Sequence, residues 1–450
     1  MQRRKKVGLL DHMGGGNLGD DATQTAVIEN ILKRWPDCEI CALSMNPTDT
    51  QARHNVPSYP LRARVWAFGG EKPGKQVNLK SKFKTTIGRF GGIYRGLQLV
   101  NYLGLRLPRI LYRELLFLIK SFAIVRSFDL LIISGGGQLM DLWGGPWGFP
   151  YTIFKWIILA KLAHIRCIVL NVGAGPLERR LSKYFIGVAL SASDYVSFRD
   201  KKSFNLIRGI GFNGKAEVFP DCVYGLDAAE FAQEEKQSTS VVGIAPMAYA
   251  DPNVYPEHDP AVYHQLIDSL DSLGSWLVHN SYSLKLFCSD IGVDPPAIED
   301  LRSHLMSSCK SPLEDAIAIP SLKSGADLLV NMASMDYVVT CRFHGVVFAH
   351  ILNKPVIAIS HHPKMSTLMN DLGLEEYCID MHACDADVLT DKLVSLVKNG
   401  QAIKKKMAEK LACYREELAE QFDQLFPNAI HQAVIEQNKS SETYSSVGMG

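Results

Sequence analysis

Two hydrophobic patterns alternate along the chain. Short runs of β-branched and aromatic residues, such as 129–134 and 337–340, are typical of strands that a parallel sheet buries on both faces. Longer segments with helical spacing lie between such runs. In 22–35, for example, apolar residues recur every three or four positions until Pro36. A chain that alternates strands with helices in this way predicts an α/β fold with mainly parallel sheets.

The alternation occurs twice, with one polar interruption. Residues 1–226 form the first block and residues 240–400 the second, and the segment between them lacks a sustained apolar period. We therefore expect two doubly wound, Rossmann-like domains that face each other across a cleft. C-terminal helices are expected over 401–437 and a disordered tail over 438–450.

Glycine-rich corners follow three predicted strands of the first block. The first, Gly14-Gly-Gly-Asn-Leu-Gly19, has the form of the dinucleotide-binding fingerprint. No acidic residue closes the next strand, however, and Asp20 and Asp21 follow the loop directly, where they would repel a pyrophosphate. The other corners are 135–137 and 173–175. Glycine lets a backbone approach a ligand closely, so we interpret these corners as one wall of a binding cleft for a sugar or another substrate.

Basic residues gather at the ends of two successive strands of the second block. Arg342 and His344 follow one strand, and His362 and Lys364 follow the next. Because ligands of open α/β sheets bind beyond the carboxyl ends of the strands, we expect these side chains to converge on one anionic ligand, a carboxylate or a phosphate. The alternative interpretation is that they are ordinary surface residues of loops.

Taken together, these motifs resemble the polysaccharide pyruvyltransferase family. In the second block the resemblance is carried by Cys341-Arg-Phe-His-Gly345, Asn353-Lys-Pro-Val-Ile-Ala-Ile359 and His361-His-Pro-Lys364. In the first block it is carried by Gly16-Asn-Leu-Gly-Asp20, Ser134-Gly-Gly-Gly137, Val172-Gly-Ala-Gly-Pro176 and the step from Arg199-Asp200 to Ser203.

The resemblance implies a GT-B-like architecture, as in two-domain glycosyltransferases. It also implies an enzyme that moves a pyruvyl group from phosphoenolpyruvate to two hydroxyls of a sugar, in a polysaccharide or its lipid-linked precursor. The product would be a cyclic pyruvate ketal, and phosphate would be released. The first domain would then hold the saccharide acceptor and the second the donor. Phosphoenolpyruvate is a substrate here, and we expect no cofactor and no metal.

The chemistry indicates which side chains would act. Phosphoenolpyruvate carries two anionic groups, which guanidinium and ammonium groups would anchor, and a histidine with a near-neutral pKa would move the protons. The expected catalytic residues are His344, with His362 as the second candidate, and Arg342. The expected donor-binding residues are Arg199, Arg342, His344 and Lys364, although Arg199 could instead pair with Asp200. The expected acceptor-binding residues are Gly16, Asn17, Gly19, Asp20, Gly136 and Gly137.

Positive charge is concentrated in one segment. The whole chain has a net charge of +1, yet residues 61–126 hold fourteen Lys or Arg against two Glu, among several aromatic residues. Such a basic insertion suits an anionic membrane surface or a pyrophosphate-linked lipid glycan, and the alternative is a solvated loop followed by a core helix. Without a nucleic-acid-binding motif, a nucleic-acid role is not expected. Ten irregularly spaced cysteines, and no apolar run long enough to span a bilayer, predict a cytoplasmic protein. Peripheral contact with the inner face of the membrane would be made through segment 61–126.

Two other functions remain open at this point. A glycosyltransferase that uses a nucleotide sugar would share the fold, and Glu375 and Glu376 are the acidic residues that could bind a ribose. A non-catalytic binder of glycans or lipid head groups would use segment 61–126 and would tolerate replacement of Arg342 and His344.

Overall fold

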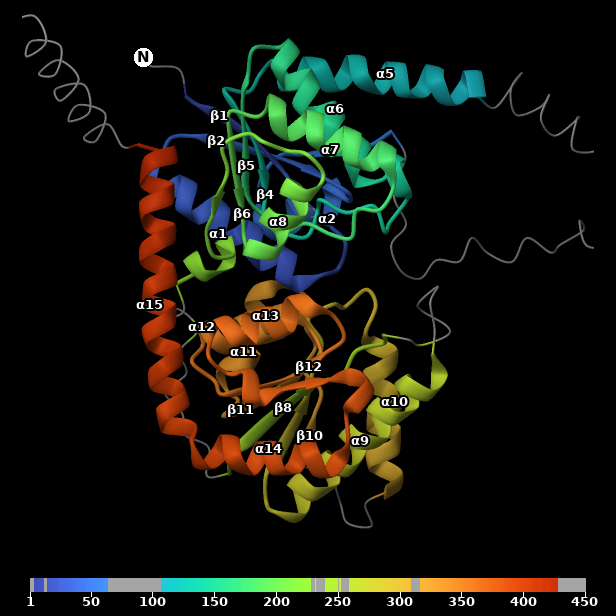
Figure 1. Ribbon diagram of the computed structural model, residues 1–450, viewed down its shortest axis with the longest axis vertical. Coiled ribbons are helices and arrows are strands. Elements are labelled where there is room, and N and C mark those ends of the chain that lie inside the picture. The colour runs from blue at the N-terminus through green and yellow to red at the C-terminus, as the bar shows by residue number, and fades with distance from the viewer. Residues whose placement is uncertain are drawn as a thin grey trace, which may run out of the picture.

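A computed structural model of the chain shows two α/β domains stacked one above the other (Figure 1). It describes residues 4–11, 14–63, 107–227, 231, 239–249, 251, 259–308 and 316–427. Most of the basic segment, residues 64–106, and the predicted tail 438–450 therefore lie outside the described residues. The expectation of two Rossmann-like domains in a GT-B-like arrangement is confirmed.

The N-terminal domain is built on a parallel sheet of seven strands. In spatial order these are β3 (Ser58–Pro60), β2 (Glu39–Ser44), β1 (Lys6–Leu10), β4 (Leu130–Ser134), β5 (Arg166–Val172), β6 (Tyr195–Phe198) and β7 (Glu217–Val218). Alternate residues point to opposite faces, so Ile132 belongs to one hydrophobic core and Ile133 to the other. Burial on both faces explains why the strands are almost wholly apolar.

Helices cover both faces of this sheet. Helix α1 and the short η3 pack on one face, and α5, α6 and α7 lie together on the other (Figure 1). The helical elements of this domain are α1 (Leu18–Arg34), α2 (Pro47–His54), α5 (Leu107–Val125), η2 (Gly145–Trp147), α6 (Phe149–Leu162), α7 (Arg180–Ala192), α8 (Lys201–Gly209) and η3 (Cys222–Gly225).

The C-terminal domain repeats the plan with six parallel strands. In spatial order these are β10 (Ile317–Ala318), β9 (Ser283–Leu286), β8 (Val241–Ala245), β11 (Tyr337–Thr340), β12 (Val356–Ser360) and β13 (Cys378–Asp380). Its helices are α9 (Pro260–His279), α10 (Pro295–Ser308), α11 (Gly325–Ala333), α12 (Phe343–Ile351), α13 (Pro363–Asp371), η5 (Glu375–Tyr377), η6 (Met381–Ala383) and α14 (Ala386–Lys398).

Both sheets have the strand order of a Rossmann fold, which reverses direction next to the first strand. The reversal lies between β1 and β4 in the N-terminal domain and between β8 and β11 in the C-terminal domain. Ligands of open parallel sheets bind at this point, beyond the carboxyl ends of the strands. The glycine corners after β1 and β4, and the residues after β11, are therefore placed where the topology forms a binding crevice.

The long helix α15 (Gly400–Leu425) joins the two domains along one side (Figure 1). Near its start, the carbonyl of Met407 lies 2.8 Å from the Nε2 atom of His350 in α12. Near its end, Arg34 of α1 pairs with Asp423 at 2.7 Å, and Asn171 of β5 exchanges amide hydrogen bonds with Gln421. This helix accounts for the described part of the C-terminal helices expected over 401–437, of which residues 428–437 are not described.

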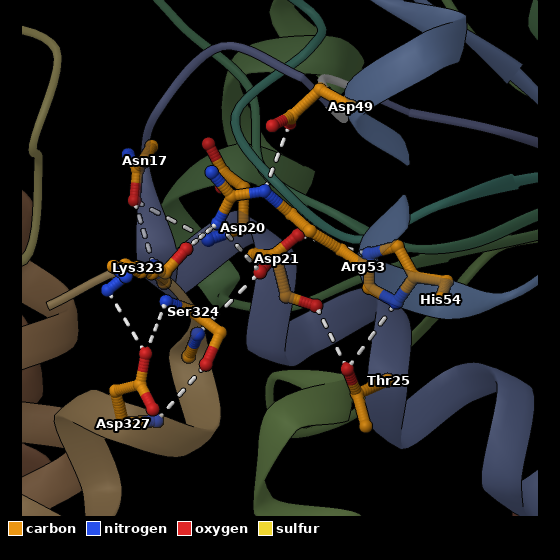
Figure 2. Close-up of polar contacts among 12 residues, drawn as sticks. Asn17, Asp20, Asp21, Thr25, Asp49, Arg53, His54, Lys323, Ser324 and Asp327 are labelled. Atoms are coloured by element: carbon orange, nitrogen blue, oxygen red, sulfur yellow. Dashed lines mark hydrogen bonds and ion pairs between the residues drawn. The ribbon is translucent and has the colours of Figure 1, made fainter. Parts of the chain in front are cut away.

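A second connection between the domains is a polar cluster around Asp21 (Figure 2). In α1, the carboxylate of Asp21 lies 2.9 Å from His54 and 3.4 Å from Arg53, both in α2. The same carboxylate accepts a hydrogen bond from the backbone N–H of Gly325 at the start of α11, and Arg53 donates to the carbonyl of Lys323. The first turn of α1 is thus attached to the C-terminal domain.

Candidate active site

His344 is a buried imidazole at the junction of the two domains. It lies in the first turn of α12, directly after β11, and is 7% exposed. A β-carbon added to Gly19, in the first turn of α1, would overlap the imidazole ring, so only glycine allows this approach. The Nε2 atom has no hydrogen-bond partner among the described residues. Burial lowers the pKa of His344, while the carboxylates of Asp20 and Asp221 act in the opposite direction. A neutral imidazole with an open nitrogen can accept a proton.

Arg199 supplies a buried guanidinium from the N-terminal domain. It follows β6, and its Nη1 atom lies 2.9 Å from the carboxylate of Asp221. Asp200 is 3.8 Å from its Nε atom, but that carboxylate is already engaged as the cap of α8. The Nε atom itself has no hydrogen-bond partner in the described part of the chain. A β-carbon at Gly173 would lie 2.6 Å from Nε, so the glycine corner after β5 makes room for this side chain.

Phe343 lies beside two cations that come from different domains. The guanidinium carbon of Arg199 lies 4.7 Å from the centre of the Phe343 ring, and Nζ of Lys364 lies 5.8 Å from it. No described carboxylate lies within ion-pair distance of Lys364. Burial and the neighbouring positive charges of Arg199 and Arg342 lower the pKa of Lys364 to about 8. Asp20 and Asp200 act in the opposite direction from a distance, and an anion bound beside Lys364 would supply a direct ion pair.

Arg342 is held by two carboxylates of its own domain. Its Nε and Nη2 atoms donate to the two oxygens of Asp294 at 2.7 and 2.6 Å, and Asp290 lies 3.7 Å from Nη1. Both acids lie in the loop between β9 and α10. Burial raises the pKa of Asp290 to about 6, although Arg342 acts to lower it. A donor could bind to the guanidinium fork of Arg342 only if it replaced Asp294 as the hydrogen-bond partner of that fork.

His362 is tied to the local backbone. It is the N-cap of α13, and its Nδ1 atom accepts a hydrogen bond from the N–H of Lys364 at 3.2 Å. Burial and the charge of Lys364 lower the pKa of His362 to about 4. The ring of its neighbour His361 lies tilted against that of Tyr249, with 4.9 Å between the ring centres, and its Nδ1 atom has no hydrogen-bond partner within the described ranges. The bond from Lys364 fixes the start of α13 and with it the position of the lysine.

The glycine corner after β4 borders the same crevice. Gly136 has φ +60°, and a β-carbon there would lie 3.0 Å from a carboxylate oxygen of Asp11 and 3.5 Å from one of Asp20. Gly137 lies next to Nη2 of Arg199. Asp11 is in turn held by Gln138 at 2.6 Å and by Gln24. Two carboxylates and an open backbone suit the hydroxyls of a sugar.

Two of the predicted acceptor residues serve the contact between the domains. The carbonyl of Gly16 accepts a hydrogen bond from the N–H of Ile291 at 3.0 Å, and Asn17 forms an isolated bridge with Asp290. Asn17 is also the N-cap of α1, because its side chain accepts from the N–H groups of Gly19 and Asp20. Asn17 therefore both caps α1 and contacts the other domain.

The structure therefore brings together most of the predicted site. The residues around the crevice are Gly19, Asp20, Gly136, Gly137, Arg199, His344 and Lys364. Sequence reasoning missed the roles of Asp11, Asp221, Asp290, Asp294, His361 and Phe343. Asp11 and Asp221 follow the ends of β1 and β7, which is a signal that could have pointed to them.

Comparisons with known proteins agree with this arrangement. A family model described as polysaccharide pyruvyl transferase matches residues 17–363. A putative UDP-N-acetylglucosamine 2-epimerase from Listeria monocytogenes has a similar structure, with a TM-score of 0.55, 9% identity, and coverage of 90% of this chain and 91% of that one.

Two further solved structures share the fold. A UDP-GlcNAc 2-epimerase from Neisseria meningitidis, bound to UDP-GlcNAc, has a TM-score of 0.53 at 12% identity and covers 92% of this chain and 97% of its own. A glycosyltransferase from Rickettsia africae has a TM-score of 0.53 at 10% identity, and the match covers 95% of this chain and 100% of the glycosyltransferase. Among curated protein sequences, none matches this chain.

Proposed function

The chain belongs to the polysaccharide pyruvyl transferase family, and from this premise we propose that its donor is phosphoenolpyruvate. The enzyme would transfer the pyruvyl group to two hydroxyls of a saccharide, in a polysaccharide or its lipid-linked precursor, and release phosphate. The observation that carries this proposal is the buried Nε2 atom of His344, which no described residue contacts by a hydrogen bond, near the cations of Arg199 and Lys364.

The donor would lie between the two cations. Phosphoenolpyruvate carries its phosphate and its carboxylate on the same carbon atom, C2, so it needs two cationic anchors close together, one for each group. Lys364 has no ion-pair partner among the described residues, where Asp20 and Asp200 act on it only from a distance, and Arg199 has an Nε atom without a hydrogen-bond partner there. The first turn of α12, which has no side-chain cap, adds backbone N–H groups at its positive end. We assign the phosphate to Lys364 and the carboxylate to Arg199.

His344 would transfer the protons of the first step. The imidazolium form of His344 gives a proton to the methylene carbon of the donor, which becomes the methyl group of the product and leaves the positive charge at C2. One hydroxyl of the acceptor then attacks C2 and gives its proton to the neutral imidazole, which restores the imidazolium. The C2–O bond to phosphate breaks next, and the second hydroxyl attacks C2 and loses its proton to the leaving phosphate. Two hydroxyl protons are thus matched by one new C–H bond and one protonated phosphate.

Arg342 and His362 would support the site without binding the donor directly. Arg342 is held by Asp294, so it contributes positive potential to the crevice rather than an open fork. His362 fixes the backbone of Lys364, which favours His344 as the acid and base. On the opposite wall, Asp20 and the corner at Gly136 would receive the sugar hydroxyls.

The geometry gives the nucleotide-sugar alternative less support. Glu375 and Glu376, the proposed ribose ligands, lie in η5 immediately before β13, at the amino end of that strand and away from the crevice. Asp290 and Asp294, which do lie beyond the carboxyl end of β9, are engaged by Arg342.

Calorimetric titrations test the choice of donor. We expect phosphoenolpyruvate to bind, and UDP- and GDP-sugars to give no heat. Lys364→Ala should weaken donor binding by about tenfold, because a hydrogen bond to a charged group contributes about 1.5–3 kcal/mol. Lys354→Ala is the matched control, since Lys354 lies at the amino end of β12, away from the crevice. Binding of nucleotide sugars alone would overturn the proposal.

A further inference from the structure

Helix α5 presents an apolar stripe that nothing in the described structure covers. Five large apolar side chains are between 40% and 62% exposed: Leu111, Tyr112, Leu115, Leu116 and Ile119. At 100° per residue these positions occupy a sector of about 140° on the helix. Exposed apolar residues are ordinary when they are scattered, but a contiguous stripe on one helix marks an interaction surface.

The opposite side of α5 is firmly attached to the domain, which fixes the direction of the stripe. Phe117 packs edge-on against Trp156 of α6, with 6.2 Å between the ring centres, and Val125 is fully buried. Glu114 forms an ion pair with Lys155 at 3.0 Å. The helix therefore has two apolar sides, one in the core of the domain and one facing away from it.

Basic residues line the exposed stripe. Arg109, Arg113 and Lys120 are exposed along one of its edges, and Arg126 is exposed just beyond its end. The only acidic residue of the helix, Glu114, points inward to Lys155. The stripe itself contains an aromatic residue, Tyr112, which is 62% exposed. Leu and aromatic residues beside Arg and Lys are the composition of helices that lie in the membrane interface.

We propose that α5 docks this protein onto an anionic lipid surface. The apolar stripe would enter the boundary between head groups and acyl chains, and Arg109, Arg113 and Lys120 would contact lipid phosphates. A second copy of the chain fits this face less well, because a two-fold contact with the two helices antiparallel would bring the same row of positive charges together. In the described part of the chain, no helix is long and apolar enough to cross a bilayer.

Docking does not depend on the proposed function, since it is measured without any substrate. If both proposals hold, the docked enzyme would meet an acceptor whose saccharide is attached to a lipid in the same membrane. Failure of the two proposals can be told apart, because donor binding is measured without vesicles and vesicle binding without donor.

Vesicle sedimentation tests the docking surface. The full chain should sediment with vesicles that contain phosphatidylglycerol and remain in solution with pure phosphatidylcholine. Leu115→Glu with Ile119→Glu should lower the partition coefficient at least about tenfold, because two apolar side chains no longer enter the interface. Arg113→Glu should lower it by about fivefold or more, which corresponds to the loss of about 1 kcal/mol for one basic residue near the surface.

A matched control uses an apolar residue on the other domain. Val394 in α14 is 50% exposed, so Val394→Glu makes the same change of chemistry far from α5 and should leave binding unchanged (Figure 1). Unaltered circular dichroism would show that the α5 variants are folded. The proposal is overturned if the wild type ignores anionic vesicles, or if the α5 variants bind them as well as the wild type. It is also overturned if the wild type is a dimer in solution that the α5 variants convert to monomers without any vesicle binding.

Discussion

Gly19 and His344 belong to different domains, and they are packed so closely that a β-carbon on Gly19 would overlap the imidazole ring. The proposed base therefore owes its position and its burial to the first turn of α1 in the other domain. Neither domain alone contains the site, because Arg199 and Asp20 come from one and His344 and Lys364 from the other.

Gly19→Ala should lower the turnover number. The added methyl group displaces His344 or moves the domains apart, and a displacement near 1 Å can lower the rate by about 100-fold. Gly187→Ala is the control, because nothing lies within 4 Å of a β-carbon at that helical position. It should keep full activity and gain up to about 1 kcal/mol of stability. Equal turnover numbers for the two variants and the wild type would contradict this account of the site.

Donor affinity should depend on the ionisation of Lys364. The pKa of Lys364 is lowered to about 8, so its ammonium group is present below that pH and is lost above it. Binding of the anionic donor should therefore weaken as the pH rises from about 7 to about 9. Calorimetric dissociation constants across this range measure the effect.

Lys364→Arg is the control variant for that titration, because a guanidinium group remains charged over the whole pH range. Its donor affinity should be lower than that of the wild type at neutral pH but should no longer fall at alkaline pH. A dissociation constant that rises equally in both proteins would assign the titration to another group.

Asp290→Asn should stabilise the fold at neutral pH. The pKa of Asp290 is raised from 3.8 to about 6, so the folded state binds a proton that the unfolded state has already lost at intermediate pH. Such a group makes stability fall as the pH rises from about 4 to about 6, by up to roughly 3 kcal/mol. Urea unfolding should show similar stability for the wild type and the variant near pH 4, and a more stable variant near pH 7. If the wild type instead became more stable than the variant between about pH 4 and about pH 7, the pKa of Asp290 would be lowered in the folded state and this prediction would be wrong.

Asp21→Ala should weaken the contact between the domains. Its carboxylate is shared by His54, Arg53 and the N–H of Gly325, so its removal leaves buried partners unsatisfied and should cost about 2 kcal/mol. Asp49→Ala also removes a partner of Arg53, at 2.9 Å, but within the N-terminal domain and nearer to solvent. It should cost less than about 1 kcal/mol in the same denaturant titration. Equal losses would show that the contact between the domains adds nothing.

Local patterns determined most of the fold. The strand predicted over 337–340 is β11, with the same first and last residues. Its bounds are easy to predict because a parallel strand that is buried on both faces consists almost entirely of apolar residues. Helix α2 was missed, although Asn46 followed by Pro47 is a strong start signal and Asn55 adopts the left-handed conformation at its end. Eight residues show too little hydrophobic periodicity to be recognised without the caps.

The site was predicted less completely, because its partners are distant in sequence. The cluster of Arg342, His344 and Lys364 could be anticipated from strand ends, whereas the pairing of Arg342 with Asp294 spans 48 residues and left no local signal. The burial of His344 depends on Gly19 in the other domain, which no pattern in either segment encodes. The sequence therefore indicated which side chains lie together in the site, and the structure shows which of them already form ion pairs with other residues of the chain.

The most direct test of the central claim is transfer of an isotopic label from the pyruvyl carbons of phosphoenolpyruvate to a saccharide. Purified protein would be incubated with labelled donor and a fraction of cellular glycans and lipid-linked saccharides, with His344→Ala as the negative control. The account predicts label in an acid-labile ketal, one phosphate released for each label transferred, and neither product with His344→Ala. Phosphate release without label in the saccharide, or equal transfer by His344→Ala, would contradict it.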